Sequence, residues 1–230
     1  MISVRGVRGG REVVSFALGH GDDPLSGLRA RGWSGRRVRV EGALGDLVLR
    51  YEVVAVTPRR PLAAPVSDLT AAELAGVVPR QRVAAYAVVV DAGRLLLTQL
   101  APRTGAEGRW TLPGGGLDPG EVPADAVVRE VLEETGQHVD AVRFVDVMTQ
   151  HWVGRSDRGV EDYHAVRLVH TARCARPTRP VVHDVGGSTS DARWVALDRL
   201  RDLEVVPTVP WALAATGVVA ANARGGAGQS

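Results

Sequence analysis

The chain of 230 residues is 45% hydrophobic and 23% charged, which is an ordinary globular balance. Its formal net charge is only +2, which gives no sign of a polyanion-binding protein, so we expect no nucleic-acid partner. The sequence has no membrane-length apolar run, no signal peptide and no disulfide partner for Cys174, so we expect a cytoplasmic protein without a membrane partner.

Residues 1–56 are predicted to form a small α+β unit. Its expected elements are a strand at 12–18, a short helix at 25–31, and a hairpin of strands at 36–42 and 46–56. Asp23 is expected to cap the helix, and Pro24 suits the first helical position, where its missing N–H has no partner to lose. We find no catalytic constellation in this unit.

The composition changes at residues 57–82, which are rich in proline and alanine and are predicted to be a linker with a helical stretch near 68–74. Over 83–223 the pattern predicts a mixed α/β layered domain. Its expected strands lie at 84–91, 94–100, 141–148, 163–172 and 192–197, and its expected helices at 124–135, 197–203 and 209–223. The Gly-rich tail, 224–230, is predicted to be disordered.

The segment WTLPGGGLDPGEVPADAVVREVLEETG, residues 110–136, carries the chemistry. Its three consecutive glycines, 114–116, would let the backbone approach a ligand closely. A turn follows, and then a helix is expected to begin near Pro123 and end at Gly136. Proline is tolerated at a first helical position, and glycine favours the position just after a helix.

Three glutamates gather on this predicted helix. Winding it at about 100° per residue places Glu130, Glu133 and Glu134 together. The packing stripe is predicted on another face and consists of Ala124, Val127, Val128, Val131 and Thr135. A solvated acidic face is the usual meaning of such a cluster. Because hard divalent cations prefer oxygen ligands, the cluster beside a glycine-rich loop also suits a metal ion and a diphosphate together.

The spacing of the whole segment resembles the Nudix box. That pattern is a glycine, five residues, a glutamate, seven residues, and then Arg-Glu-apolar-any-Glu-Glu-any-Gly-apolar. Here its fixed positions are filled by Gly115, Glu121, Arg129, Glu130, Val131, Glu133, Glu134 and Gly136. The chain departs from it at Gln137, where the family prefers an apolar residue. Segments on either side extend the resemblance over about residues 80–215.

This resemblance implies an α/β fold, a sandwich of the α/β/α type around a mixed sheet, in which the box holds Mg²⁺ or Mn²⁺. It assigns metal ligation to Glu133, Glu134, Glu130 and the carbonyl of Gly115, and catalytic roles to Glu130, Arg129 and Glu121. Glu130 is also a candidate general base toward water, whereas Arg129 would orient the carboxylates through ion pairs. The implied reaction is attack of water on one phosphorus of a diphosphate.

Residues outside the box could complete the site. A further acidic ligand or base is sought among Glu161, Asp162 and Asp184, although spacing fixes none of them. Trp152 is a candidate for stacking on a nucleobase. Arg109 is a candidate for binding a phosphate, since every basic side chain of this protein is an arginine.

No subfamily signature accompanies the box, so the expected substrate is a small nucleotide-type molecule, a nucleoside di- or triphosphate derivative. One alternative is a catalytically silent Nudix-fold ligand sensor or interaction domain, which the intact glutamates argue against. Another is an isomerase on the same fold, which would need a catalytic cysteine, and Cys174 lies in the wrong region for that. The N-terminal unit is expected to shape substrate access or to mediate a homodimer.

Overall fold

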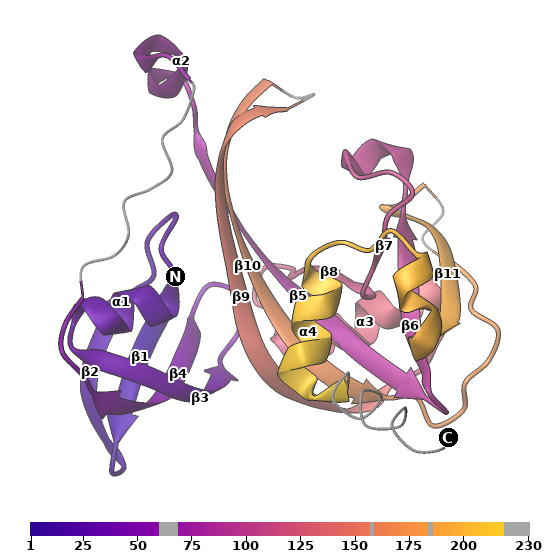
Figure 1. The fold of residues 1–230 in the computed structure, drawn as a ribbon, viewed down its shortest axis with the longest axis horizontal. Helices are drawn as coiled ribbons and strands as arrows, with labels where there is room; N and C mark the ends of the chain where they lie inside the picture. The colour runs from indigo at the N-terminus through magenta and orange to yellow at the C-terminus, as the bar shows by residue number, and fades with distance from the viewer. Residues whose placement is uncertain (60–68, 157–158, 184–185, 219–230) are drawn as a thin grey trace, which may run out of the picture. The chain divides into compact units, whose positions relative to one another are not determined.

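The computed structural model describes residues 1–59, 69–156, 159–183 and 186–218, and the chain forms two compact units (Figure 1). Unit 1 comprises Met1–Ala84, Leu117–Val122 and Asp146–Arg167, and unit 2 comprises Ala85–Gly116, Pro123–Val145 and Leu168–Ser230. The domain bounds expected from the sequence remain a prediction. The predicted tail, 224–230, and most of the first half of the predicted linker lie outside the described residues.

Unit 1 contains a four-stranded sheet of order β2-β1-β4-β3. Its strands are β1 (Ile2–Arg8), β2 (Arg11–Ala17), β3 (Trp33–Glu41) and β4 (Leu47–Ala55). β1 pairs in parallel with β4 and antiparallel with β2, so this sheet is mixed. The predicted hairpin is present as the antiparallel pair β3 and β4. The sequence analysis missed β1, in which buried Ile2 and Val4 alternate with less buried side chains.

The first helix, α1 (Pro24–Ala30), begins as the sequence predicts. The Asp23 side chain caps it by accepting a hydrogen bond from the backbone N–H of Ser26 at 2.8 Å. Leu28 is fully buried on the side that packs against β3. A second short helix, α2 (Ala71–Ala75), lies in the predicted linker and begins with a capping box formed by Thr70 and Glu73.

A seven-stranded sheet has the order β11-β6-β5-β10-β9, with β7 paired to β6 and β8 paired to β5. Its strands are β5 (Pro79–Asp91), β6 (Arg94–Leu100), β7 (Trp110–Thr111), β8 (Gly114–Gly116), β9 (Asp140–Ser156), β10 (Gly159–Arg173) and β11 (Thr189–Ala196). Every strand predicted for this part of the chain is present. β9 is longer than predicted, because its second half, QHWVGRS, carries polar residues that hide the strand pattern.

In the described residues of unit 2 there are two α-helices, α3 (Pro123–Thr135) and α4 (Thr208–Thr216). Figure 1 shows α4 in front of the sheet and α3 behind it. The buried apolar side chains of α4 belong to a core that also contains Val88, Leu95, Leu97, Trp110, Leu112 and Val169. Short 3-10 helices occupy Pro102–Thr104 and Leu197–Asp202, the second where a helix was predicted. These sheets and helices confirm the predicted α/β class.

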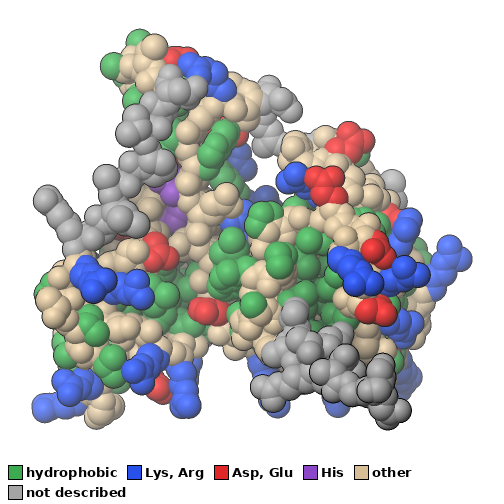
Figure 2. Space-filling model, in the orientation of Figure 1, with side chains coloured by type: hydrophobic (Ala, Val, Ile, Leu, Met, Phe, Trp, Pro, Cys, Tyr) green, Lys and Arg blue, Asp and Glu red, His purple; other side chains and the backbone are tan. Residues whose placement is uncertain are grey.

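Charged side chains of both signs are interspersed on the face shown in Figure 2, and all the basic ones are arginines. None of the helices in the described parts of the chain has the length and apolar character needed to cross a bilayer.

Candidate active site

The glycine loop before α3 lies directly against the backbone of β5. Gly114 has a φ of +145°, and a Cβ there would lie 2.2 Å from the carbonyl oxygen of Ala85. The preceding carbonyl, that of Pro113, accepts a hydrogen bond from the backbone N–H of Ala87 at 2.9 Å. Only glycine permits both the conformation and this close approach. The loop is therefore held in one position at the side of α3.

The packing face of α3 differs from the predicted one. Its buried residues are Pro123, Ala126, Val127, Val131, Glu134 and Thr135. Val128 is 40% exposed and Ala124 is only half-buried, so the prediction was wrong at these two positions. The predicted face was chosen from the apolar residues of the helix, whereas the structure buries Ala126 and a glutamate. α3 ends at Gly136 as predicted, with a φ of +66°.

Glu134 is a buried carboxylate with two hydrogen bonds. The residue is only 5% exposed. Oε2 accepts the backbone N–H of Gly114 at 2.9 Å, and Oε1 accepts the hydroxyl of Thr189 at 2.5 Å. These bonds satisfy a charge that would otherwise be costly to bury. They also join α3 to the glycine loop and to β11.

Arg129 connects the other two glutamates of the helix. Its Nη1 lies 2.8 Å from Oε1 of Glu130 and 3.2 Å from Oε2 of Glu133. Its Nη2 donates to the carbonyl oxygen of Gly116 at 3.1 Å. The guanidinium is thus already engaged by two carboxylates and the glycine loop. The orienting role that the resemblance implies for Arg129 stays a prediction.

Glu130 lies against the glycine loop. A Cβ built on Gly115 would be 2.5 Å from its Oε1 and 2.6 Å from its Oε2. The Glu130 side chain is 14% exposed, compared with 47% for Glu133. The absence of a side chain at position 115 therefore leaves the space that the Glu130 carboxylate occupies.

The cluster carries an excess of negative charge. Three carboxylates and one guanidinium, Arg129, have formal charges of −3 and +1, which leaves −2. Each carboxylate oxygen has two lone pairs, so accepting one hydrogen bond still leaves it able to bind a cation. An all-oxygen donor set with this charge fits a hard divalent ion such as Mg²⁺ or Mn²⁺.

A comparison with known families shows to which family the chain belongs. The model of the NUDIX domain matches residues 79–212, more than half of the chain. The chain belongs to the Nudix family. The prediction of a Nudix pyrophosphohydrolase is thereby confirmed at the level of the family.

The chain is similar to individual Nudix proteins at about one third identity or less. The chain is 33% identical over 135 residues to the nucleoside triphosphatase NudI of Enterobacter sp. (strain 638), covering 55% of this chain and 89% of that protein. It is 31% identical over 106 residues to an RNA pyrophosphohydrolase of Helicobacter pylori, covering 40% of this chain and 65% of that protein. The crystal structure of a MutT NUDIX hydrolase from Burkholderia pseudomallei is 30% identical, with a TM-score of 0.47, and is aligned over 59% of this chain and 97% of that one.

The remaining residue of the Nudix box, Glu121, lies in the loop before α3. Its carboxylate accepts the backbone N–H of Asp118 at 2.8 Å and so closes the turn. The backbone carbonyl of Glu121 also accepts the N–H of Leu44, in the β3–β4 turn of the N-terminal sheet. The predicted role of Glu121 in the carboxylate network remains a prediction.

The candidates outside the box have varied surroundings. Arg109 pairs with Glu204 at 2.8 Å on the surface, and Trp152 on β9 is 38% exposed. Glu161 is half-buried on β10, and Asp184 lies outside the described residues. Asp162 is hydrogen-bonded to two histidines; burial alone would raise its pKa, but these hydrogen bonds outweigh burial and lower it.

Thr189 is the site residue that the sequence analysis missed. It is 6% exposed and donates its hydroxyl to Glu134, which lies 55 residues earlier in the chain. The strand predicted for this region, 192–197, begins three residues after Thr189, whereas β11 begins at Thr189 itself. A threonine hydroxyl carries no spacing signal, so only the fold shows that β11 brings it to the carboxylate.

Proposed function

We propose that this Nudix protein is a divalent-metal-dependent hydrolase. It cleaves a diphosphate linkage in a nucleoside di- or triphosphate derivative by attack of water on phosphorus. The observation that carries this proposal is the group of three glutamates on α3, ordered by Arg129 and Thr189 beside the glycine loop. The names of both relatives, a nucleoside triphosphatase and an RNA pyrophosphohydrolase, agree with phosphate-linkage hydrolysis.

Each residue of the cluster has a distinct part in this proposal. Glu133 and Glu134 bind Mg²⁺ or Mn²⁺, with the Gly115 carbonyl as a further ligand. The bound cation supplies charge neutralisation at the phosphate oxygens and lowers the pKa of its water. Glu130 ligates the cation or accepts the proton of the attacking water. Arg129 holds Glu130 and Glu133 in place and does not touch the substrate.

The proposal also covers the domain bounds, the cellular location and the role of the N-terminal unit. The catalytic domain extends over 83–223, preceded by the small unit at 1–56 and a linker at 57–82. The protein acts in the cytoplasm, and its N-terminal unit shapes substrate access or forms a homodimer.

A substrate panel tests this proposal. Purified protein is incubated with nucleoside triphosphates, ADP-ribose, nucleotide sugars and dinucleotides, with and without Mg²⁺, and the released phosphate and nucleotide are measured. Hydrolysis of one class, only with metal, is the expected result. Tight binding of a nucleotide without turnover in Mg²⁺ or Mn²⁺ would instead support the silent ligand sensor and contradict the enzyme.

A further inference from the structure

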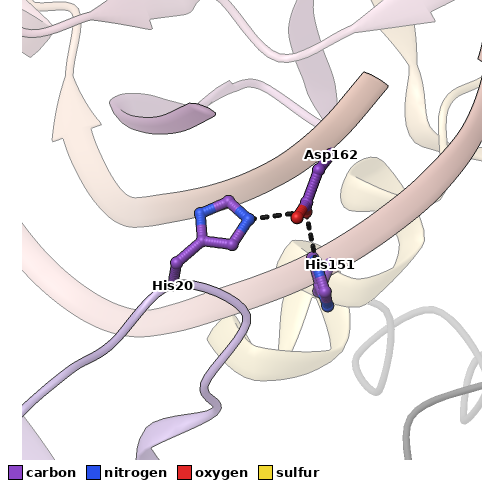
Figure 3. Close-up of side chains that lie close together, drawn as sticks. All are labelled: His20, His151 and Asp162. Atoms are coloured by element: carbon purple, nitrogen blue, oxygen red, sulfur yellow. Dashed lines mark hydrogen bonds and ion pairs between the residues drawn. The ribbon is translucent and has the colours of Figure 1, made fainter. Parts of the chain in front are cut away.

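A second cluster of ligand-type side chains lies in unit 1, away from the Nudix box in sequence. Its members are His20 in the β2–α1 loop, His151 on β9 and Asp162 on β10. Figure 3 shows both imidazoles directed at the Asp162 carboxylate. Nε2 of His20 lies 2.6 Å and Nε2 of His151 lies 2.7 Å from the same oxygen, Oδ1. The three ligand atoms all lie within 4.8 Å of one another.

The loop that carries His20 is fixed by several hydrogen bonds. The backbone N–H of Gly19 donates to Oδ2 of Asp22 at 2.9 Å. Asp23, the cap of α1, also accepts the hydroxyl of Thr149 at 2.9 Å, which ties the loop to β9 two residues before His151. His20 is therefore held beside β9 and β10, next to His151 and Asp162.

A glycine opens the space for His151. Gly21 has a φ of +77°, and a Cβ there would lie 2.8 Å from Nδ1 of His151. Any other residue would be strained at this φ and would push the imidazole away. The hydrogen bonds of the loop fix His20, and the absence of a side chain at Gly21 leaves space for the His151 ring beside it.

A third imidazole stands beside the cluster. His164 is fully buried, and its ring centroid lies 5.6 Å from that of His20 and 6.2 Å from that of His151. Its Nδ1 lies 3.0 Å from Nε2 of Gln81, which donates to it; exchange of the amide oxygen and nitrogen would let Gln81 accept from Nδ1–H instead. Burial lowers the pKa of His164, and the nearby backbone of Asp22 raises it in part; within the described residues no hydrogen bond of normal geometry reaches the buried Nε2. Such an atom is costly unless a ligand satisfies it.

We propose that His20, His151 and Asp162 form a binding site for Zn²⁺, with the imidazole of His164 closing its buried side. Imidazole nitrogens together with one carboxylate oxygen are typical zinc ligands. Ligand atoms around a tetrahedral zinc with bonds of about 2.0–2.1 Å are roughly 3.3 Å apart, so the two contacts between histidine and Asp162, at 2.6 and 2.7 Å, need to open by about 0.6–0.7 Å. Each ligating ring would carry its proton on Nδ1, which leaves the Nε2 lone pair for the metal.

The chemistry of this site separates it from the Nudix box. The box offers oxygen atoms only and suits Mg²⁺, whereas nitrogen ligands favour zinc and related transition metals. The side chains of His20 and His151 are 25% and 27% exposed, so an ion can reach them, and histidine side chains are visible on the surface in Figure 2. The proposal does not depend on the diphosphate reaction.

Metal titration of the full-length protein tests the site. After removal of metal with a chelator, Zn²⁺ binding is measured by competition with a chromophoric chelator in excess Mg²⁺, which saturates the oxygen sites. We expect one Zn²⁺ per chain and a thermal unfolding temperature that rises on its addition. In His151→Gln and Asp162→Asn, zinc affinity should fall by about 100-fold or more.

Two controls locate the binding. His138→Gln, which changes an exposed histidine, and Glu134→Gln, which changes the box, should both leave zinc affinity unchanged. The proposal is overturned if the wild-type protein binds no Zn²⁺ at micromolar concentrations, because the cluster is then a hydrogen-bonded network only. Unchanged zinc affinity in both folded cluster variants, judged by circular dichroism, would overturn it equally.

Discussion

The carboxylate of Glu130 occupies the space that a side chain at Gly115 would take, with only 2.5 Å between its Oε1 and the position of a Cβ. The obstructed group is the end of a flexible side chain, so Gly115→Ala should displace Glu130 without unfolding the loop. A displacement of about 1 Å can cost roughly 100-fold in rate. We therefore expect kcat to fall by about that factor while the thermal unfolding temperature changes little.

The matched control for this prediction is Gly76→Ala at the end of α2. Gly76 has a φ of −92°, and its nearest neighbour would be an ordinary contact at 3.9 Å. Steady-state kinetics and thermal unfolding of both variants make the comparison. A fully active Gly115→Ala enzyme would show that the position of Glu130 does not matter for turnover.

Thr189 is expected to act as a positioning residue for Glu134. Thr189→Val removes the hydroxyl that donates to Oε1, while the Gly114 N–H still binds Oε2. Loss of such a supporting group typically costs about 10- to 100-fold in metal affinity or activity. The Mg²⁺ concentration for half-maximal rate should rise accordingly, and Thr189→Ser should restore it. If the valine variant and the wild-type enzyme show equal Mg²⁺ dependence, Thr189 does not position Glu134 for metal binding.

Gln137 is predicted to stabilise the fold although the family pattern favours an apolar residue there. It is 1% exposed; its Nε2 donates to the hydroxyl of Thr178 at 2.9 Å, and its Oε1 accepts the Thr178 N–H at 2.9 Å. Gln137→Leu would remove both bonds; because Thr178 is exposed and its freed groups can bind water, the cost should be about 0.5–1.5 kcal/mol in the free energy of unfolding.

Denaturant unfolding measures this difference, with the exposed Gln150→Leu as the control. The control should be nearly neutral. A leucine at position 137 that equals or exceeds wild-type stability would show that the apolar preference of the family also holds here.

His170 should make the protein less stable in weak acid. It is 1% exposed, donates from Nδ1 to the carbonyl of Leu168 and packs against Phe144. Burial lowers the pKa of His170 from 6.5 to about 4, so between these values the unfolded chain binds the extra proton. Stability present above pH 6.5 is then lost as the pH falls toward 4, by up to about 3 kcal/mol.

Unfolding free energies at neutral and weakly acidic pH test this sign. His170→Leu should show a smaller loss between the two pH values than wild type, whatever its absolute stability. The exposed His138→Gln should match the wild-type loss. An identical loss in the leucine variant would assign the acid sensitivity to other groups.

The sequence analysis predicted correctly the features that depend on residues close together in the chain. The cap at Asp23, the end of α3 at Gly136 and most strands follow from residue patterns that span a few positions. The packing face of α3 was partly wrong because the pattern could not show that Glu134 turns inward toward two hydrogen-bond donors.

Long-range partners could not be predicted. Thr189 reaches Glu134 across 55 residues, and His20 reaches Asp162 across 142. Neither pair has a spacing signature, since each depends on which strand or loop the fold places beside the other. The carboxylates themselves were identified because the Nudix box holds them within one loop and one helix.

The most direct test of metal-dependent hydrolysis compares the wild-type enzyme with Glu130→Gln and Glu134→Gln. Turnover of its best substrate is measured as Mg²⁺ is raised, with the exposed Asp125→Asn on the same helix as the control. We expect no turnover without metal, a loss of about 100- to 10,000-fold in kcat for Glu130→Gln, and an equally severe loss for Glu134→Gln that excess Mg²⁺ does not fully restore. Wild-type turnover by both folded glutamine variants, or full activity in excess chelator, would contradict the account.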